Sequence, residues 1–129
     1  MKIDQSAKGC KMELNKMHEK ALEVSRIIRE VFRDRVKYTE IYDAADQDNY
    51  HGFKIRFMAY DYFGVIFQCE QDIIGCSLAM GNDFLIPVTE GQYCLSDTDL
   101  NKYFNDVKEM IELRIPDKYL KAKGWFEGE

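Results

Sequence analysis

The side chains with the potential for metal or acid–base chemistry are few and widely separated. Histidine occurs twice: His18 lies beside Glu19 and Lys20 on the polar side of a predicted helix, and His51 follows two aspartates in the pattern Asp46-x-Asp48-x-x-His51. A calcium-binding EF-hand loop that began at Asp46 would need glycine at its sixth position and glutamate at its twelfth, where this chain has His51 and Phe57. Zinc would need more nitrogen or sulfur ligands than His51 offers locally. We therefore expect no metal ion and no other cofactor.

The nucleophilic side chains also lack the partners that catalysis requires. The sequence contains no Gly-x-Ser-x-Gly motif, no glycine-rich phosphate-binding loop and no His-Glu-x-x-His motif. Gly75-Cys76-Ser77 offers a thiol and a hydroxyl, but it lies in an apolar, strand-like run far from both histidines. A buried strand is the simpler interpretation of this tripeptide. The sequence therefore favours a protein that is not an enzyme.

An acidic segment with tyrosines in the middle of the chain is the feature that most suggests binding. Residues 37–95 carry nine acidic and three basic side chains, whereas residues 1–36 have a net charge of +3. Within this region, residues 40–50 contain no cation and six side chains suited to an interface: Glu40, Tyr42, Asp43, Asp46, Asp48 and Tyr50. Clustered charge steers a partner of opposite sign, and tyrosine often carries interface energy. We expect a surface for a basic partner here, extended by Asp61, Glu70 and Asp72 near predicted strand ends.

Length and composition limit the class of protein. The 129 residues, 46% of them apolar, fit a single folded domain over residues 1–129. The net charge of −5 disfavours nucleic acid or an anionic membrane as the partner. The first residues lack the apolar run of a secretion signal, and the four cysteines form no Cys-x-x-Cys pair. These features predict a cytoplasmic protein whose cysteines, Cys10, Cys69, Cys76 and Cys94, are reduced. Their even number leaves a disulfide framework as the alternative, although a chain of 129 residues does not need one.

The spacing of apolar residues predicts two helices. From residue 10 onward, apolar side chains recur at alternating intervals of four and three: Cys10, Leu14, Met17, Ala21, Val24, Ile28 and Val31. This stripe predicts a helix over about 11–35 that packs on a sheet, with the seam of a coiled-coil dimer as the alternative. A second helix is expected over about 97–114, starting in residues 96–99 and ending before Pro116. A short helical turn is expected over 117–123.

Between these helices the period changes to two. Residues 53–60 alternate as a half-buried strand does, and further strands are expected at 62–70, 73–80 and 83–88. Residues 37–42 are expected to form a short edge strand, and residues 43–52 a polar loop. The order predicts an α+β domain: a long N-terminal helix, an antiparallel meander of four or five strands and a C-terminal helix, with both helices on one sheet face. In this arrangement the carboxylates of 40–48 point outward together.

Aromatic residues along the strands suggest an alternative function. Six of them fall in the two predicted central strands: Phe53, Phe57, Tyr60, Tyr62, Phe63 and Phe67. A curved sheet lined by such residues and backed by a helix, as in the NTF2-like and cystatin-like folds, encloses a small-molecule pocket. The alternative is therefore a small-molecule-binding or isomerase-like module with a pocket under a curved sheet. Packing in an ordinary core accounts for the same aromatic residues equally well.

The closing segment 113–125, Leu-Arg-Ile-Pro-Asp-Lys-Tyr-Leu-Lys-Ala-Lys-Gly-Trp, is similar to the ends of some bacterial immunity proteins. In its small size, acidity and lack of a catalytic motif, the whole chain also resembles the immunity proteins of contact-dependent inhibition and polymorphic toxin systems. Those proteins are antitoxins that occlude a cognate toxin domain, very often a basic nuclease. The resemblance implies a cytoplasmic immunity protein whose partner is a basic toxin domain. It transfers no residue role and no oligomeric state.

Overall fold

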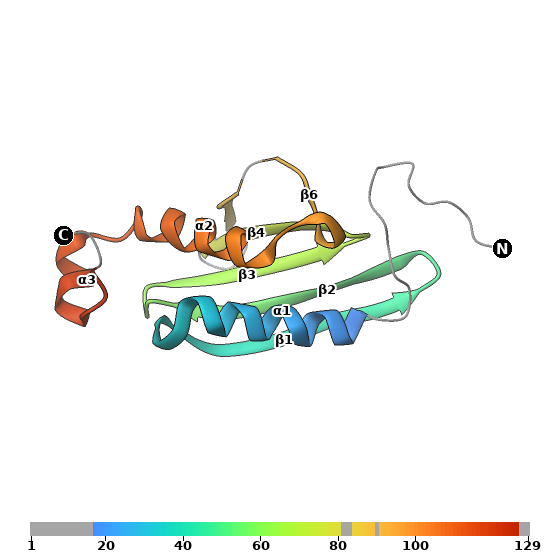
Figure 1. Cartoon of the computed structure of the whole chain (residues 1–129), viewed down its shortest axis with the longest axis horizontal. Coiled ribbons are helices and arrows are strands. Elements are labelled where there is room, and N and C mark those ends of the chain that lie inside the picture. The colour runs from blue at the N-terminus through green and yellow to red at the C-terminus, as the bar shows by residue number, and fades with distance from the viewer. Residues whose placement is uncertain (1–16, 81–83, 90, 127–129) are drawn as a thin grey trace.

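In the computed structural model, residues 17–80, 84–89 and 91–126 are described. Their elements are α1 (Met17–Phe32), η2 (Arg33–Arg35), β1 (Val36–Gln47), β2 (Tyr50–Ala59), β3 (Phe63–Glu70), β4 (Ile73–Met80), β5 (Phe84–Pro87), β6 (Tyr93–Cys94), η3 (Leu95–Asp97), α2 (Leu100–Glu112) and α3 (Asp117–Lys123). Figure 1 shows the long strands side by side, with α3 at the end of the molecule opposite the β1–β2 turn.

The strands form one antiparallel meander in the order β1-β2-β3-β4-β5, and β6 pairs with the other half of β4. A two-residue turn, Gln71-Asp72, joins β3 to β4, and both of its residues have positive φ, 52° and 69°. Turns of this kind match the twist of paired strands. The expected turn at Gly81-Asn82 lies outside the described residues. The predicted α+β class and the meander are confirmed.

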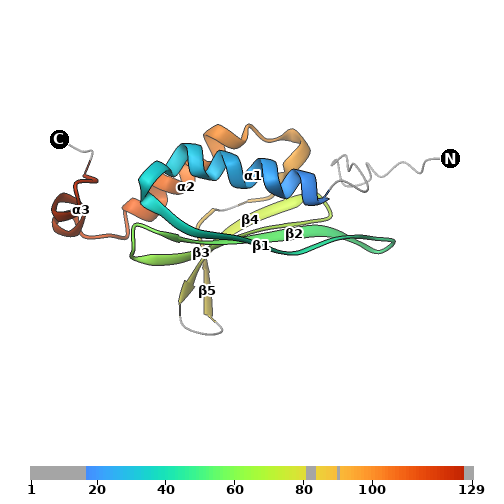
Figure 2. The same cartoon turned by 90° about the horizontal axis from the view of Figure 1, so that it is seen from below.

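Helices α1 and α2 lie on the same face of the sheet (Figure 2), as predicted. The expected apolar stripe of α1 faces the core, with Met17, Val24 and Ile28 buried and Val31 half-buried. The part of the expected helix before residue 17, including Leu14, lies outside the described residues. The packing of α1 on strands β1 and β2 supports the sheet-packing interpretation of the stripe.

Aromatic side chains fill the space between the sheet and the helices. Phe53, Phe57 and Phe67 are at most 1% exposed. The ring of Phe57 meets that of Phe32 in α1 at 5.5 Å, and the ring of Phe67 meets that of Phe104 in α2 at 5.2 Å. Such edge-on and tilted contacts between rings are typical of a packed core. The helix-facing aromatic residues therefore contact one another, as core residues do.

The prediction for residues 37–52 was wrong in one respect. The segment expected to be a polar loop continues β1 to Gln47, and β2 begins at Tyr50. The register of β1 shifts between Lys37 and Glu40 and again between Tyr42 and Ala45, with positive φ at Tyr38 (56°) and Asp43 (55°). Each bulge displaces the alternation of side chains by one residue. Because β1 is also an edge strand, its many polar residues are compatible with a strand.

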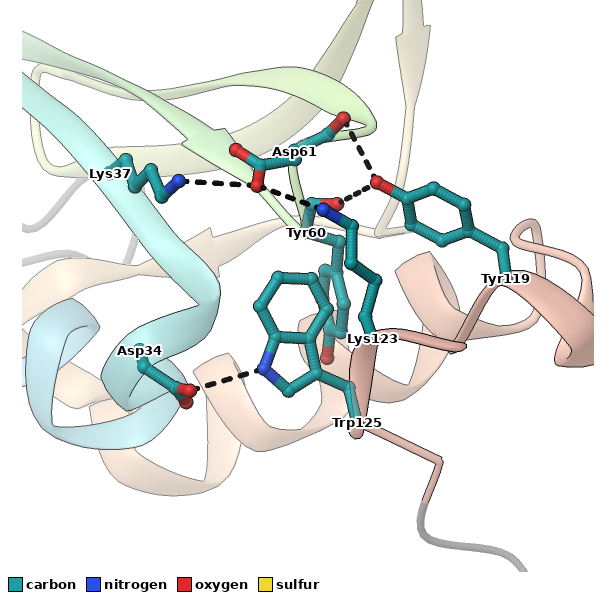
Figure 3. A network of polar contacts seen from close by, with 7 residues as sticks. All are labelled: Asp34, Lys37, Tyr60, Asp61, Tyr119, Lys123 and Trp125. Atoms are coloured by element: carbon teal, nitrogen blue, oxygen red, sulfur yellow. Dashed lines mark hydrogen bonds and ion pairs between the residues drawn. The ribbon is translucent and has the colours of Figure 1, made fainter. Parts of the chain in front are cut away.

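The C-terminal helices α2 and α3 agree with the expected ones, apart from the position at which α2 begins. Asp99 caps α2, because its side chain accepts hydrogen bonds from the backbone N–H groups of Asn101 (3.1 Å) and Lys102 (3.3 Å). The helix therefore starts at Leu100 and not within residues 96–99. Helix α3 spans 117–123 as expected. Trp125 folds back, and its indole N–H donates to Asp34 at 3.2 Å (Figure 3).

Candidate binding surface

The sheet has one face that no described element covers. The helices lie on the opposite face, and the β4–β5 hairpin projects away from them (Figure 2). We call this surface the open face and define it by the residues that alternate with the core positions of the strands: Glu40, Tyr42, Lys54, Arg56, Met58, Gly64, Ile66, Gln68, Gly75, Ser77, Ala79 and Leu85. It combines a charged half with an apolar half.

The apolar half lies over β3 and β4. Its floor is made by small residues, among them Gly64, Gly75 and Ala79, beside the half-buried side chain of Ile66. A Cβ atom added at Gly75 would meet nothing within 4 Å, so neither packing nor a positive φ requires glycine there. Glycine inside a strand often marks a close approach by another molecule. This part of the face is therefore open to a partner beside the projecting β4–β5 hairpin (Figure 2).

The charged half lies over β1 and β2, and its charges are paired. Glu40 accepts a hydrogen bond from Arg56 at 3.0 Å, and Asp43 lies 3.5 Å from Lys54. Both cations also lie near the ring of Tyr42, at 5.2 Å for Arg56 and 5.9 Å for Lys54. Cation–π contacts of this kind add to the attraction of the ion pairs. The four charges thus neutralise one another around one tyrosine.

A hollow of about 400 Å³ opens where these strands meet the end of β3, lined by Asp43, Ala44, Ala45, Tyr50, Lys54 and Glu70. The Tyr50 side chain lies over Gly52, because a Cβ atom added there would be 2.8 Å from the Tyr50 hydroxyl oxygen and 2.3 Å from the carbonyl oxygen of Cys69. Burial, and next the nearby Glu70 carboxylate, raise the pKa of Tyr50. Its hydroxyl is therefore protonated at neutral pH.

A second hollow, of about 370 Å³, continues along the turn between β3 and β4, lined by Gln68, Glu70, Gln71, Ile73, Ile74 and Gly75. Glu70 borders both hollows. Its exposed side chain therefore lies between the two hollows, at the end of the open face near the β3–β4 turn.

Of the side chains expected to bind a partner, the structure brings together Glu40, Tyr42, Asp43, Tyr50 and Glu70. These five come from three strands, and all border the open face or its hollow. Tyr50 and Glu70 meet because the β1–β2 turn and the β3–β4 turn lie at the same end of the sheet. We therefore take the charged half and its hollow as the candidate site.

Asp46 and Asp48 do not join this group. Asp46 points to the helix side, where it accepts a hydrogen bond from the Met17 backbone N–H at 3.2 Å and lies 3.4 Å from the Nδ1 atom of the buried His51. Asp48 is exposed at the tip of the β1–β2 turn. The prediction that the carboxylates of 40–48 all point outward together was therefore wrong. The bulge between Tyr42 and Ala45 inserts one residue into β1, so Asp46 faces the side of the sheet opposite to Glu40.

Asp61 lies at the far end of the sheet, in the turn between β2 and β3. Its carboxylate is 3.2 Å from the Lys37 ammonium and 3.6 Å from that of Lys123, the last residue of α3 (Figure 3). The Tyr119 hydroxyl donates to the backbone carbonyls of Tyr60 (2.9 Å) and Asp61 (3.3 Å). In this structure Asp61 helps to hold the C-terminal helix in place.

Asp72 is buried, with 4% of its surface exposed. Its carboxylate accepts hydrogen bonds from the Ser96 backbone N–H (3.2 Å) and hydroxyl (2.7 Å). Burial raises the pKa of this carboxyl group, although the bonds from Ser96 oppose the shift. Asp72 therefore joins the β3–β4 turn to the segment before α2, and it is not presented to a partner.

Other chemical groups do not assemble into a site. Among residues 17–80, 84–89 and 91–126, no three His, Cys, Asp or Glu side chains are grouped as metal ligands would be. Cys69 and Cys76 are free and buried, and burial raises the pKa of each thiol to about 12. Cys94 is disulfide-bonded, contrary to the expectation that it is reduced. Cys10 lies outside the described residues.

Sequence analysis did not identify the residues of β2, β3 and β4 that form most of the open face. Lys54, Arg56 and Met58 were recognisable as the solvent-side positions of an alternating strand. The apolar half was harder to find, because Gly64 and Gly75 give no side-chain signal.

Comparison with known proteins found no relative of this chain: no family model, no curated protein and no solved structure matches it. No helix within the described ranges is long and apolar enough to cross a membrane.

Proposed function

We propose that this protein is an immunity protein that binds a cognate toxin domain with its open face and thereby blocks the toxin. The observation that carries the proposal is a sheet face without a covering layer among the described elements (Figure 2). Exposed apolar patches bordered by polar residues are typical of protein interfaces. Here Ile66 and its small neighbours form the apolar part, and the ion pairs around Tyr42 form the polar border.

The charge at one end of this face supports a basic partner. Glu40 and Asp43 are paired with cations of β2, whereas Glu70 and Asp48 are exposed carboxylates near the β3–β4 and β1–β2 turns. Complementary charge accelerates encounter and orients the two proteins. A toxin domain with a basic surface beside an apolar protrusion fits both halves of the open face.

The alternative, a small-molecule or isomerase-like module, receives less support. Its pocket was expected under the curved sheet, but Phe53, Phe57 and Phe67 are packed there against the helices. Both hollows described above lie elsewhere: the first is beside the charged half of the open face, and the second is along the turn between β3 and β4. The surface therefore favours recognition of a protein.

The experiment that tests the proposal compares two lysine substitutions. Ile66→Lys places a charge in the middle of the apolar half, whereas Leu22→Lys makes the same kind of change on α1, where Leu22 is 52% exposed. Candidate toxin domains encoded by neighbouring reading frames are titrated into each protein by calorimetry, and toxin activity is measured in parallel. We expect a 1:1 complex with the wild type and with Leu22→Lys, and at least about 100-fold weaker binding for Ile66→Lys.

Equal affinity of the two variants would contradict the proposed interface. Absence of any complex between the wild-type protein and the toxin domain would contradict the proposed function. Circular dichroism of both variants establishes that each retains the fold.

A further inference from the structure

We propose that the hollow lined by Asp43, Tyr50, Lys54 and Glu70 binds one arginine side chain of the partner. The guanidinium stacks on the Tyr50 ring and forms a charge-assisted hydrogen bond with the Glu70 carboxylate. This inference rests on the proposed function and names the chemistry of its anchor.

The charges that line the hollow favour one cation. Asp43 and Glu70 contribute two negative charges and Lys54 one positive charge. Lys54 already lies 3.5 Å from Asp43 and near the Tyr42 ring. One further positive charge next to Glu70 therefore makes the group neutral, whereas an anion would meet two carboxylates.

The aromatic floor of the hollow is held in place before a ligand arrives. Tyr50 lies across Gly52, where the absence of a side chain leaves room for the ring. The adjacent residue, His51, is fixed because its backbone N–H donates to the Gln71 side chain at 2.6 Å and its carbonyl accepts from the Gln71 backbone N–H at 2.8 Å. A ring fixed in this way loses little entropy when a ligand stacks on it.

The shape and lining of the hollow favour arginine over lysine. A guanidinium is planar, stacks on aromatic rings and binds carboxylates through two N–H groups, whereas an ammonium is a compact, strongly hydrated charge. Ala44 and Ala45 line the β1 side without adding charge, which suits the methylene stem of the same residue. The hollow, about 400 Å³ in volume and open to solvent, has room for one arginine side chain.

The test uses three small probes at low salt: N-acetyl-arginine amide, N-acetyl-lysine amide and N-acetyl-citrulline amide. Citrulline has nearly the shape of arginine without its charge. Backbone amide signals of the full chain are followed by NMR during each titration. We expect saturable shifts around Tyr50, Gly52 and Glu70 with arginine, at a Kd on the order of 1–10 mM. Lysine and citrulline should bind at least about tenfold more weakly.

Three variants locate the effect. Glu70→Gln and Tyr50→Leu should each weaken binding of the arginine probe at least about fivefold. Glu109→Gln removes an exposed carboxylate from α2, on the other side of the sheet, and it should leave the titration unchanged. Equal binding of arginine and citrulline, or equal effects of Glu70→Gln and Glu109→Gln, would overturn the inference.

These results are separable from the test of function. If Ile66→Lys abolishes the toxin complex while the arginine probe does not bind, the arginine site is wrong and the interface stands. If the probe binds as expected but the toxin domain forms no complex, the immunity function is wrong and the hollow is still an arginine site.

Discussion

Asp72 and Glu70 are separated by a single residue, yet they lie in opposite environments. Glu70 ends β3 on the surface, whereas Asp72 is buried against Ser96, which precedes α2. Burial of Asp72 raises its pKa, so the folded protein binds a proton there more tightly than the unfolded chain does. The folded protein is therefore less stable when Asp72 is ionised than when it is protonated.

This difference predicts how stability depends on pH. As the pH rises from below about 4, the usual pKa of an aspartate, through the raised pKa of Asp72, the wild type should lose stability relative to Asp72→Asn. The side-chain amide introduced by this substitution is neutral at every pH. Its carbonyl oxygen can still accept from the Ser96 backbone N–H, and its NH2 group can donate to the Ser96 hydroxyl. Urea unfolding of both proteins between about pH 3.5 and about pH 7 measures the difference. Parallel stability curves would show that Asp72 ionises as easily in the folded protein as in water.

At the scale of single elements, two glycines in similar strand positions have different reasons for being glycine. Gly52 in β2 has the carbonyl of Cys69 and the Tyr50 side chain where a Cβ atom would be, whereas the space beside Gly75 in β4 is empty. Packing thus fixes the identity of Gly52, and nothing in the described fold fixes that of Gly75.

Substitution of each glycine by alanine should therefore have opposite effects. Gly52→Ala should lower the free energy of unfolding by about 1–3 kcal/mol, because backbone and ring must move apart. Gly75→Ala should raise it by about 0.5–1 kcal/mol, since glycine is the weaker residue inside a strand. Chemical denaturation of the two variants beside the wild type provides the measurement. Destabilisation by Gly75→Ala would mean that an unrecognised contact requires this glycine.

The elements also show which parts of the molecule were predictable from sequence. The stripe of α1 and the alternation in β2 were recognisable because each repeats locally with a constant period. The two bulges in β1 break that constancy, so its second half was assigned to a loop. The role of Asp72 depends on Ser96, 24 residues away, and no local pattern records such a contact. Likewise, only the assembled sheet brings Tyr50 next to Glu70.

For the whole molecule, the rate of association with the toxin domain should depend more on where the negative charges lie than on the net charge. Asp43 borders the hollow and Asp48 is at the tip of the neighbouring turn, so Asp43→Lys with Asp48→Lys reverses the charge at the end that meets the partner. Association with the toxin domain at low salt should slow at least about tenfold, and the effect should diminish as salt rises. Stopped-flow fluorescence at several salt concentrations measures both.

A matched control keeps the same change in net charge. Asp106→Lys with Glu109→Lys alters exposed positions on α2, on the other side of the sheet. Its association rate should be close to that of the wild type; equal slowing by both double variants would assign the effect to net charge alone. Asp46 is left out of the design because it contacts Met17 and His51, and its replacement would disturb the fold.

The two bulges of β1 have a further consequence for behaviour at high protein concentration. An edge strand with an unbroken row of free N–H and C=O groups is a template on which another chain can add, and successive additions produce fibrils. In β1 this row is displaced near Tyr38 and again near Asp43, so a second chain could keep its hydrogen bonds in step for only a few residues. The opposite edge is made of two short strands, β5 with four residues and β6 with two, and β5 ends in Pro87, which has no N–H to offer. Both edges of the sheet are thus poor templates for a further strand, although the sheet has a broad uncovered face.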